Sequence, residues 1–217
     1  MSKFIENIRD RISYDIFTDE AVHQLIRESP DTRYGMVKRA IAKGELIHLR
    51  RGLYGFAKKY QRRGTNLFEL AQIIYGPSYI SFESALSHHG WIPEAVYTIT
   101  SAAIKRSKTY DTPLGMFSYT HIPADPFFKG VKRIENPNGV SFVAAPWKAL
   151  ADYVYANKKD WLGIQPLIRD LRIEEKYLKQ ADPNLLDELK ECYNSLRVKN
   201  FIEGVKKSFG KSKGQTL

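Results

Sequence analysis

The sequence predicts an α+β fold: an N-terminal winged helix-turn-helix, then an α+β domain with a small antiparallel sheet, and a helical C-terminal extension. Three observations predict it. Two helical segments and a hairpin precede residue 62, strand-like runs fill residues 95–145, and helical spacing returns from residue 147 to about 209. The last residues, 210–217, have the composition of a disordered tail.

The first clear helix start follows a stretch of weak helical spacing at residues 1–14. Thr18 precedes two acids and predicts an N-cap, because its side-chain oxygen can accept from an unpaired backbone N–H, so we expect a helix at 19–28. Ser29 and Pro30 predict a second N-cap and first helical residue. Gly44 is typical of the position past a helix end. The second helix therefore has about fourteen residues and follows a tight turn.

The second helix has two different faces at 100° per residue. The first is apolar and predicted to be buried; it comprises Tyr34, Met36, Val37, Ala40 and Ile41. The other is cationic, with small residues between the charges; it comprises Thr32, Gly35, Lys38, Arg39, Ala42 and Lys43.

A hairpin is predicted directly after this helix, in "ELIHLRRGLYGFA". Ile47 and Leu49 alternate with His48 and Arg50, and the chain turns at residues 51–52 into a second β-forming run. A helix fits the DNA major groove, and a hairpin with an arginine tip can lie along phosphates. The order of these elements therefore predicts a DNA-binding domain at residues 1–62.

Positive charge is concentrated in this domain. The chain has a net charge of +10. Residues 33–63 contain ten Lys and Arg and one acid, Glu45, which is +9. The remaining residues contain 24 basic and 23 acidic side chains, which is +1. Localised cationic charge attracts polyanions, whereas scattered lysines mainly confer solubility. This shift in charge places the domain boundary near residue 62.

The predicted second domain, residues 63–209, begins with two helical segments, "NLFELAQIIYG" and "SFESALSHHG". Strands are predicted in "AVYTITSA", "GMFSYTHI" and "KRIENPNGVSFVAA", the last with a hairpin loop at residues 136–139. Helical segments follow from "WKALADYVYA" onward, interrupted at Pro166 and Pro183. The aromatic residues of the middle region are predicted to be core, because no Lys or Arg between residues 64 and 100 could hold a stacked nucleic acid.

Three segments in this order, "GELIHLRRGLYGFA", "YISFESALSHHGWIP" and "AAPWKALADYVY", resemble the AbiEi family of bacterial antitoxins over roughly residues 18–160. The family has an N-terminal winged helix with a G-x-L-x-x-x-R-R-G-x-Y segment, followed by S-A-L-x-x-H-G and P-x-K-A-L-x-D stretches. Trp147 stands where the family pattern has an acidic residue, and the helical region 160–209 is longer than the part that matches.

The resemblance implies a cytoplasmic antitoxin that represses its own operon. Its partners would be double-stranded DNA with inverted repeats, bound as a monomer or homodimer, and a cognate AbiEii-type nucleotidyltransferase toxin. Phage defence is the context that this family implies. The resemblance assigns no toxin-facing residues here.

Candidate DNA-contacting residues come from the second helix and the hairpin. Base contacts are expected near the start of the helix, and phosphate contacts from its end and the hairpin, with Lys58 and Lys59 as further candidates. Gly35 costs helix stability, about 1 kcal/mol relative to alanine, which a close approach to DNA or to a packed neighbour would explain. The full set is Thr32, Arg33, Tyr34, Gly35, Lys38, Arg39, Lys43, Arg50 and Arg51.

No catalytic, cofactor or metal site is predicted. His88 and His89 lie five and six residues after Glu83, which does not match the i, i+3 or i, i+4 spacing of metal ligands on a helix, and we expect them to cap and pack a helix end. No phosphate-binding glycine loop is present. The alternative function is a metal-dependent nuclease using Asp170 and the acids of "EEK" at 174–176, although these acids lie in a helical pattern.

The sequence also predicts a soluble protein of a reducing compartment. Cys192 is the one cysteine, which excludes an internal disulfide. No apolar run approaches the ~18 residues of a membrane span, and no signal-peptide pattern follows Met1. We therefore expect a cytoplasmic protein without a membrane partner.

Overall fold

The computed structural model describes residues 1–123, 125, 127–179 and 181–212, with side chains in the last helix up to Phe209. The chain is a mixed α+β protein that divides into two compact units. The first unit contains Met1–Leu67 and Tyr110–Gly115, and the second contains Phe68–Thr109 and Met116–Leu217. The division falls five residues after the predicted boundary. It also assigns the segment 110–115 to the first unit, which nothing in the sequence predicted.

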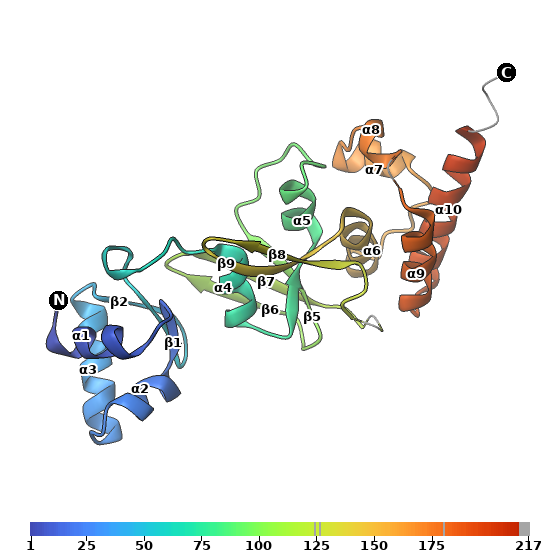
Figure 1. The fold of residues 1–217 in the computed structure, drawn as a ribbon. Helices are drawn as coiled ribbons and strands as arrows, with labels where there is room; N and C mark the ends of the chain where they lie inside the picture. The colour runs from blue at the N-terminus through green and yellow to red at the C-terminus, as the bar shows by residue number, and fades with distance from the viewer. Residues whose placement is uncertain (124, 126, 180, 213–217) are drawn as a thin grey trace. The chain divides into compact units, whose positions relative to one another are not determined.

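Three helices and a small sheet pack together in the first unit (Figure 1). The sheet is antiparallel, with strand order β1-β3-β2. Its core includes Ile5, Val22, Val37 and Phe56, so each of the three helices and the hairpin contributes an apolar side chain. The elements are α1 (Lys3–Arg11), β1 (Ile16–Thr18), α2 (Asp19–Leu25), α3 (Pro30–Ala42), β2 (Leu46–Arg50), β3 (Leu53–Phe56) and the 3₁₀ turn η1 (Lys58–Tyr60).

Both predicted helix starts are confirmed. Thr18 Oγ1 accepts from the backbone N–H of Ala21 at 3.2 Å, and Ser29 Oγ accepts from that of Thr32 at 3.3 Å. Helix α2 ends at Leu25, three residues before the predicted end. Helix α3 ends where predicted, with Gly44 at a φ of +62°. Positive φ is readily adopted by glycine, so this residue lets the chain leave α3 and enter β2.

The predicted hairpin turn is confirmed, but the alternation along β2 is not. The turn lies at residues 51–52, where Gly52 has a φ of +70°. The strand pairing shifts between His48 and Arg50, so Leu46 and Leu49 are the buried residues and Ile47 is half-buried. A bulge adds a residue to one strand, and the side chains after it therefore change face.

A six-stranded sheet of order β6-β7-β5-β4-β9-β8 forms the centre of the second unit, although most of β6 and the first residue of β7 lie in the segment 110–115 that is assigned to the first unit. The prediction of an antiparallel sheet was wrong: β4 pairs with β5 and β8 with β9 antiparallel, but β5 pairs with β7 and β4 with β9 in parallel. The sequence also missed the short strand β4 and the edge strand β6. The elements are α4 (Leu67–Ile74), β4 (Ser78–Ile80), α5 (Phe82–His88), β5 (Ile99–Ala103), β6 (Lys108–Thr112), β7 (Gly115–His121), β8 (Val131–Asn136) and β9 (Gly139–Ala144).

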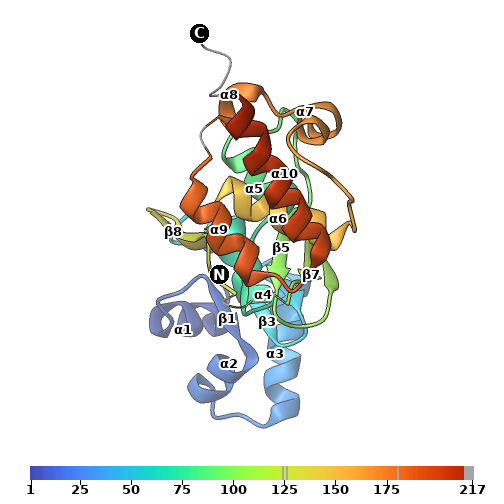
Figure 2. The same ribbon diagram turned by 90° about the vertical axis from the view of Figure 1, so that its right-hand side faces the viewer.

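Helices α6 (Pro146–Ala156), α9 (Pro183–Cys192) and α10 (Leu196–Ser212) form a layered end of the second unit. Helix α6 packs on α5 and β9 on one side and on α9 and α10 on the other (Figures 1 and 2). Two short helices, α7 (Gln165–Leu171) and α8 (Glu175–Leu178), connect α6 to α9. Pro166 and Pro183 lie in first turns, where proline is tolerated because those N–H groups have no helical partner.

Helix α10 continues to Ser212, three residues into the predicted tail of residues 210–217. The rest of that tail lies outside the described residues. Within the part of the chain that the structure describes, every helix is too short or too polar to cross a lipid bilayer.

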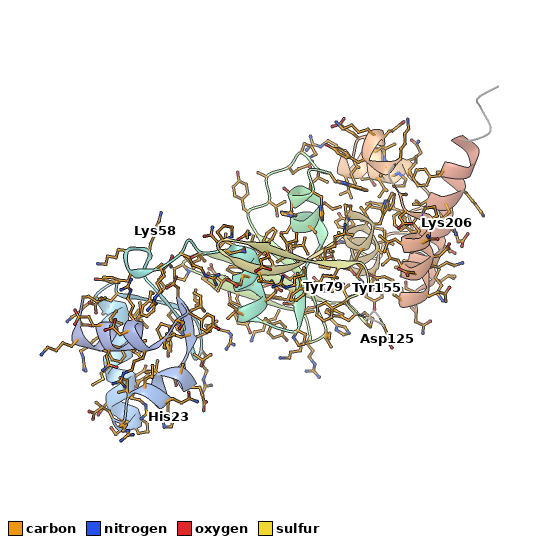
Figure 3. All side chains as sticks on the ribbon, in the orientation of Figure 1. His23, Lys58, Tyr79, Asp125, Tyr155 and Lys206 are labelled. Atoms are coloured by element: carbon orange, nitrogen blue, oxygen red, sulfur yellow. The ribbon has the colours of Figure 1, made fainter. Side chains whose placement is uncertain are left out.

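A fully buried ion pair joins the layers of the second unit. Lys148 and Asp152 on α6 are both 0% exposed, with Nζ 3.3 Å from Oδ1. Tyr79, labelled in Figure 3, and Ser81 donate to Asp152 Oδ2 at 3.0 and 2.6 Å. Tyr193 donates to Asp152 Oδ1, and its oxygen accepts from Lys148 Nζ at 2.6 Å. The Lys and Asp of the P-x-K-A-L-x-D stretch thus tie α6 to β4 and to the end of α9.

Burial, and then the nearby Asp152 carboxylate, raises the pKa of Tyr79 and Tyr193 well above the usual value. Both hydroxyls therefore remain protonated donors at neutral pH. The network satisfies the charges of Lys148 and Asp152 inside the protein, which is the condition for a buried ion pair to persist.

Candidate nucleic-acid interface

The outer face of α3 carries the exposed side chains of the predicted site. Thr32, Tyr34, Lys38 and Arg39 are exposed, and Val37 and Ala40 are buried against the core on the opposite side. The exposed residues fall on consecutive turns of one helix. They project a hydroxyl, a phenol and two cations from a surface about 10 Å long, at 1.5 Å per residue.

Two residues lie on the face opposite to the one predicted. Tyr34, which the spacing placed on the apolar face although it was also a candidate DNA contact, is 69% exposed. Arg33, a predicted base contact, is half-buried and donates to the carbonyl oxygen of Glu28. Spacing explains both positions. Tyr34 is one turn before Lys38, and Arg33 is one turn before Val37, so each shares the face of its i+4 neighbour. The i, i+4 spacing in the sequence was therefore sufficient to predict both positions.

Gly35 lies between the cations of the outer face. A Cβ built there would be 3.4 Å from Nη1 of Arg39, and no backbone atom is among its nearest neighbours. Packing within the protein therefore does not require glycine at this position. Gly35 had two explanations, a packed neighbour within the protein and a close approach to DNA. The first does not apply, because no atom of the protein packs tightly against this position. The second, a close approach from outside, still requires glycine.

The hairpin presents arginine at its tip. Arg51 is exposed and Arg50 is half-buried, with its Nη1 donating to the Arg51 carbonyl oxygen at 3.0 Å. Lys43, at the C-terminal end of α3, is exposed. Helix α3 and β2 pack on each other, so the end of the helix and the hairpin belong to one rigid element pair. Guanidinium and ammonium groups so held suit contacts with phosphates.

Two carboxylates that could neutralise this surface are directed inward instead. Glu45, the one acid of segment 33–63, is 6% exposed and accepts from the N–H and Oγ of Ser2, each at 2.7 Å. The bonds from Ser2 lower its pKa, so it stays ionised. Asp15 is 8% exposed and accepts from the backbone of Arg62 and Arg63 at 2.9 and 3.1 Å.

The cations of the segment therefore divide into two groups. Arg33 and Arg62 bond to the protein itself, through the Glu28 carbonyl and through Asp15 and the Arg9 carbonyl. Arg50 likewise donates to the Arg51 carbonyl oxygen, and Arg63, which is exposed, also has an interaction within the protein. The remaining six cations are exposed, as Lys58 is in Figure 3. Lys58 and Lys59 were secondary candidates in the sequence, and both are exposed in η1. The exposed group comprises Lys38, Arg39, Lys43, Arg51, Lys58 and Lys59.

The histidines and serines of the second unit have structural contacts. His88 packs edge-on against Phe68, with ring centroids 5.5 Å apart, and His89 Nε2 lies 2.9 Å from the Ala144 carbonyl oxygen. Burial lowers the pKa of His89, which keeps it neutral. Ser84 Oγ donates to the Thr98 carbonyl oxygen at 3.2 Å. No three His, Cys, Asp or Glu among the described residues are grouped as metal ligands.

The acids of the nuclease alternative contact neighbouring cations. Asp170, on α7, lies 2.7 Å from Arg169, and Glu174, before α8, lies 2.8 Å from Lys176. The bond from Arg169 lowers the pKa of Asp170. These carboxylates are held in local ion pairs on helical segments.

Neither the protein-family models nor the curated proteins with which the sequence was compared match this chain.

Proposed function

We propose that this chain is a sequence-specific DNA-binding protein in which residues 1–62 act as a winged helix-turn-helix. Helix α3 is the recognition helix, and the β2–β3 hairpin is the wing. The observation that supports this most directly is the exposed outer face of α3 beside an arginine-tipped hairpin, with Glu45 and Asp15 turned inward. A major groove about 12 Å wide accepts a helix, and the adjacent hairpin reaches the phosphates.

In this proposal, the exposed side chains have different tasks. Thr32, Lys38 and Arg39 contact base edges, where an arginine can bond guanine through two donors. Lys43, Arg50 and Arg51 contact phosphates and set the position of α3 on the duplex. Arg33 has a positioning role, because it bonds within the protein. A half-site would be read by one copy, and an inverted repeat by two.

The regulatory part of the proposal rests on the three segments that resemble the AbiEi antitoxins. Under it, the protein represses its own operon and counters a nucleotidyltransferase-type toxin encoded beside it. Co-expression tests this: growth arrest caused by the product of the neighbouring gene should be relieved by this protein. A neighbouring product that is harmless, or whose toxicity is unaffected, would refute the antitoxin assignment and leave DNA binding to be judged separately.

The DNA-binding assignment is tested by mobility shift on the DNA upstream of the protein's own gene, against a scrambled duplex of equal length, at several salt concentrations. We expect selective and salt-sensitive retardation. Replacing Arg50 and Arg51 by alanine should lower the slope of log K against log salt by about 1.8, at ~0.9 per phosphate contact. The control is Lys179→Ala with Lys207→Ala, two exposed lysines of the second unit. Equal, weak binding to both duplexes would refute sequence recognition.

A further inference from the structure

A cationic pocket lies in the second unit, far in sequence from the predicted DNA-binding residues. Its volume is about 620 Å³. It is formed by the turn that connects β5 to β6, with one side chain following α4 and one at the end of β7. None of the described residues that line it carries a carboxylate. The lining residues are Tyr75, Ile104, Lys105, Arg106, Ser107 and His121.

The charge of this turn is a local feature. Residues 64–104 contain no Lys or Arg, and the next four residues, "KRSK", contain three. All four are exposed. Lys206 and Arg197 of the basic C-terminal region, for comparison, form ion pairs with Asp187 and Asp160 at 2.5 and 2.7 Å, and Lys108 also has an interaction within the protein. The turn therefore presents cationic charge to solvent in a part of the unit where the sequence provides little other positive charge.

Tyr75 holds the turn in place. Its ring packs edge-on against the buried Tyr119, with centroids 5.1 Å apart, and its hydroxyl donates to the Arg106 carbonyl oxygen at 3.0 Å. The ammonium of Lys105 lies 5.6 Å from the centroid of the same ring. A single anchored aromatic side chain thus positions both the ammonium of Lys105 and the backbone of Arg106. Such preorganisation reduces the entropy lost when these side chains bind an anion.

Ser107 adds a neutral donor at the same place. Its Oγ accepts from the backbone N–H of His121 at 2.9 Å, which leaves the hydroxyl hydrogen to be donated outward. A guanidinium, an ammonium and a hydroxyl that line one pocket without a carboxylate form the donor set typical of a phosphate oxyanion.

We infer that this pocket, the Lys105–Ser107 pocket, binds a backbone phosphate of double-stranded DNA. The inference rests on the proposed DNA-binding function and extends it to the second unit. A phosphodiester fits better than a free anion because the donors are exposed and Lys108 continues the cationic run beyond the pocket. Contacts of this kind add affinity that is independent of base sequence.

The test is a comparison of salt dependence in the full-length protein, by fluorescence anisotropy with the upstream duplex. The variant Lys105→Gln with Arg106→Gln should lower the slope of log K against log salt by about 1.8, the value for two lost phosphate contacts. The matched control, Lys179→Gln with Lys207→Gln, removes two exposed charges of the same unit and should leave the slope unchanged. The thermal midpoint of both variants should equal that of the parent.

Each outcome decides between the two proposals. If Arg50 and Arg51 variants change the slope but Lys105→Gln with Arg106→Gln does not, the pocket inference fails and the DNA-binding function stands. If binding is unselective for sequence but still depends on Lys105 and Arg106, the pocket inference stands and the recognition of an operator fails. If the parent binds no duplex, both fail.

A second arm separates the two sources of phosphate. Calorimetry with inorganic pyrophosphate, and then with ADP, should show no saturable binding to the parent protein at micromolar concentration. Saturable binding that is lost in Lys105→Gln with Arg106→Gln, with the DNA slope unchanged, would assign the pocket to a free phosphate compound and overturn the assignment to the nucleic-acid backbone.

Discussion

Two lysines, one in each unit, have opposite environments. Lys38, on the outer face of α3, is exposed, whereas Lys148 on α6 is 0% exposed and bonded to Asp152 and Tyr193. In the first unit, Glu45 and Asp15 are buried, whereas Asp31 on α3 and Asp19, which bonds to the hairpin turn through the Gly52 carbonyl oxygen, stay exposed. The second unit brings an acid and a cation together in the core. The comparison teaches that net charge indicates a binding surface only when the neutralising carboxylates are directed elsewhere.

The two arrangements have different energetic consequences. An exposed lysine contributes little to folding, because water and salt screen its interactions. A buried pair must have every donor and acceptor satisfied, and removing one member leaves a charge inside a medium that solvates it poorly. Mutations of the exposed cations on the outer face of α3 should therefore change DNA affinity at constant stability, and mutations in the buried network should change stability at constant DNA affinity.

The largest expected effect is that of Asp152→Ala. It leaves Lys148 buried without its carboxylate and deprives Tyr79 and Tyr193 of their acceptor. We therefore expect the free energy of unfolding to fall by about 3–5 kcal/mol. Urea denaturation of the full-length chain measures this. The control is Asp160→Ala, whose exposed carboxylate lies 2.7 Å from Arg197 and should matter little. A loss below 1 kcal/mol for Asp152→Ala would show that the buried network does not stabilise the second unit.

Arg39→Ala tests the exposed cations of the first unit, which the comparison sets against the buried ion pair of the second. We expect a loss of about 1–3 kcal/mol in affinity for the upstream duplex, the range for one base contact, with no change in the unfolding midpoint. The matched variant is Arg33→Ala, on the same helix but directed to the Glu28 carbonyl. It should affect stability more than base preference. Reversed results for the two arginines would mean that the other face of α3 enters the groove.

The smallest expected effect is that of Gly35→Ala. Alanine should stabilise α3 by up to about 1 kcal/mol, because the new Cβ meets only the flexible end of Arg39. The same methyl should weaken DNA binding if the backbone of α3 approaches the duplex at this point. Thermal denaturation and mobility shift on the same sample check the two effects. A stabilised protein with unchanged affinity would contradict the close approach.

Much of the local structure could be predicted from the sequence. Thr18, Ser29 and Pro30 begin the helices they were expected to begin, and Gly52 and the 136–139 segment form the two predicted turns. The cationic segment was also evident before the structure. These features depend on residues within about four positions of one another, since caps and turns are closed by short-range hydrogen bonds. The outer face of α3 was predicted except for Tyr34, which the spacing placed on the apolar face, and Arg33, a predicted base contact, bonds within the protein instead.

The tertiary structure decided everything that depends on distant partners. The parallel pairs β5–β7 and β4–β9, the strand β4 and the bulge in β2 are fixed by pairing and packing across the sheets, which residue propensity does not encode. Tyr193 reaches Asp152 across 41 positions, and Tyr75 reaches Arg106 across 31. Composition and short-range spacing thus determined the helices, the turns and the location of charge in the sequence, whereas folding determined which charges are buried in pairs and which face solvent, because burial is a property of the assembled core.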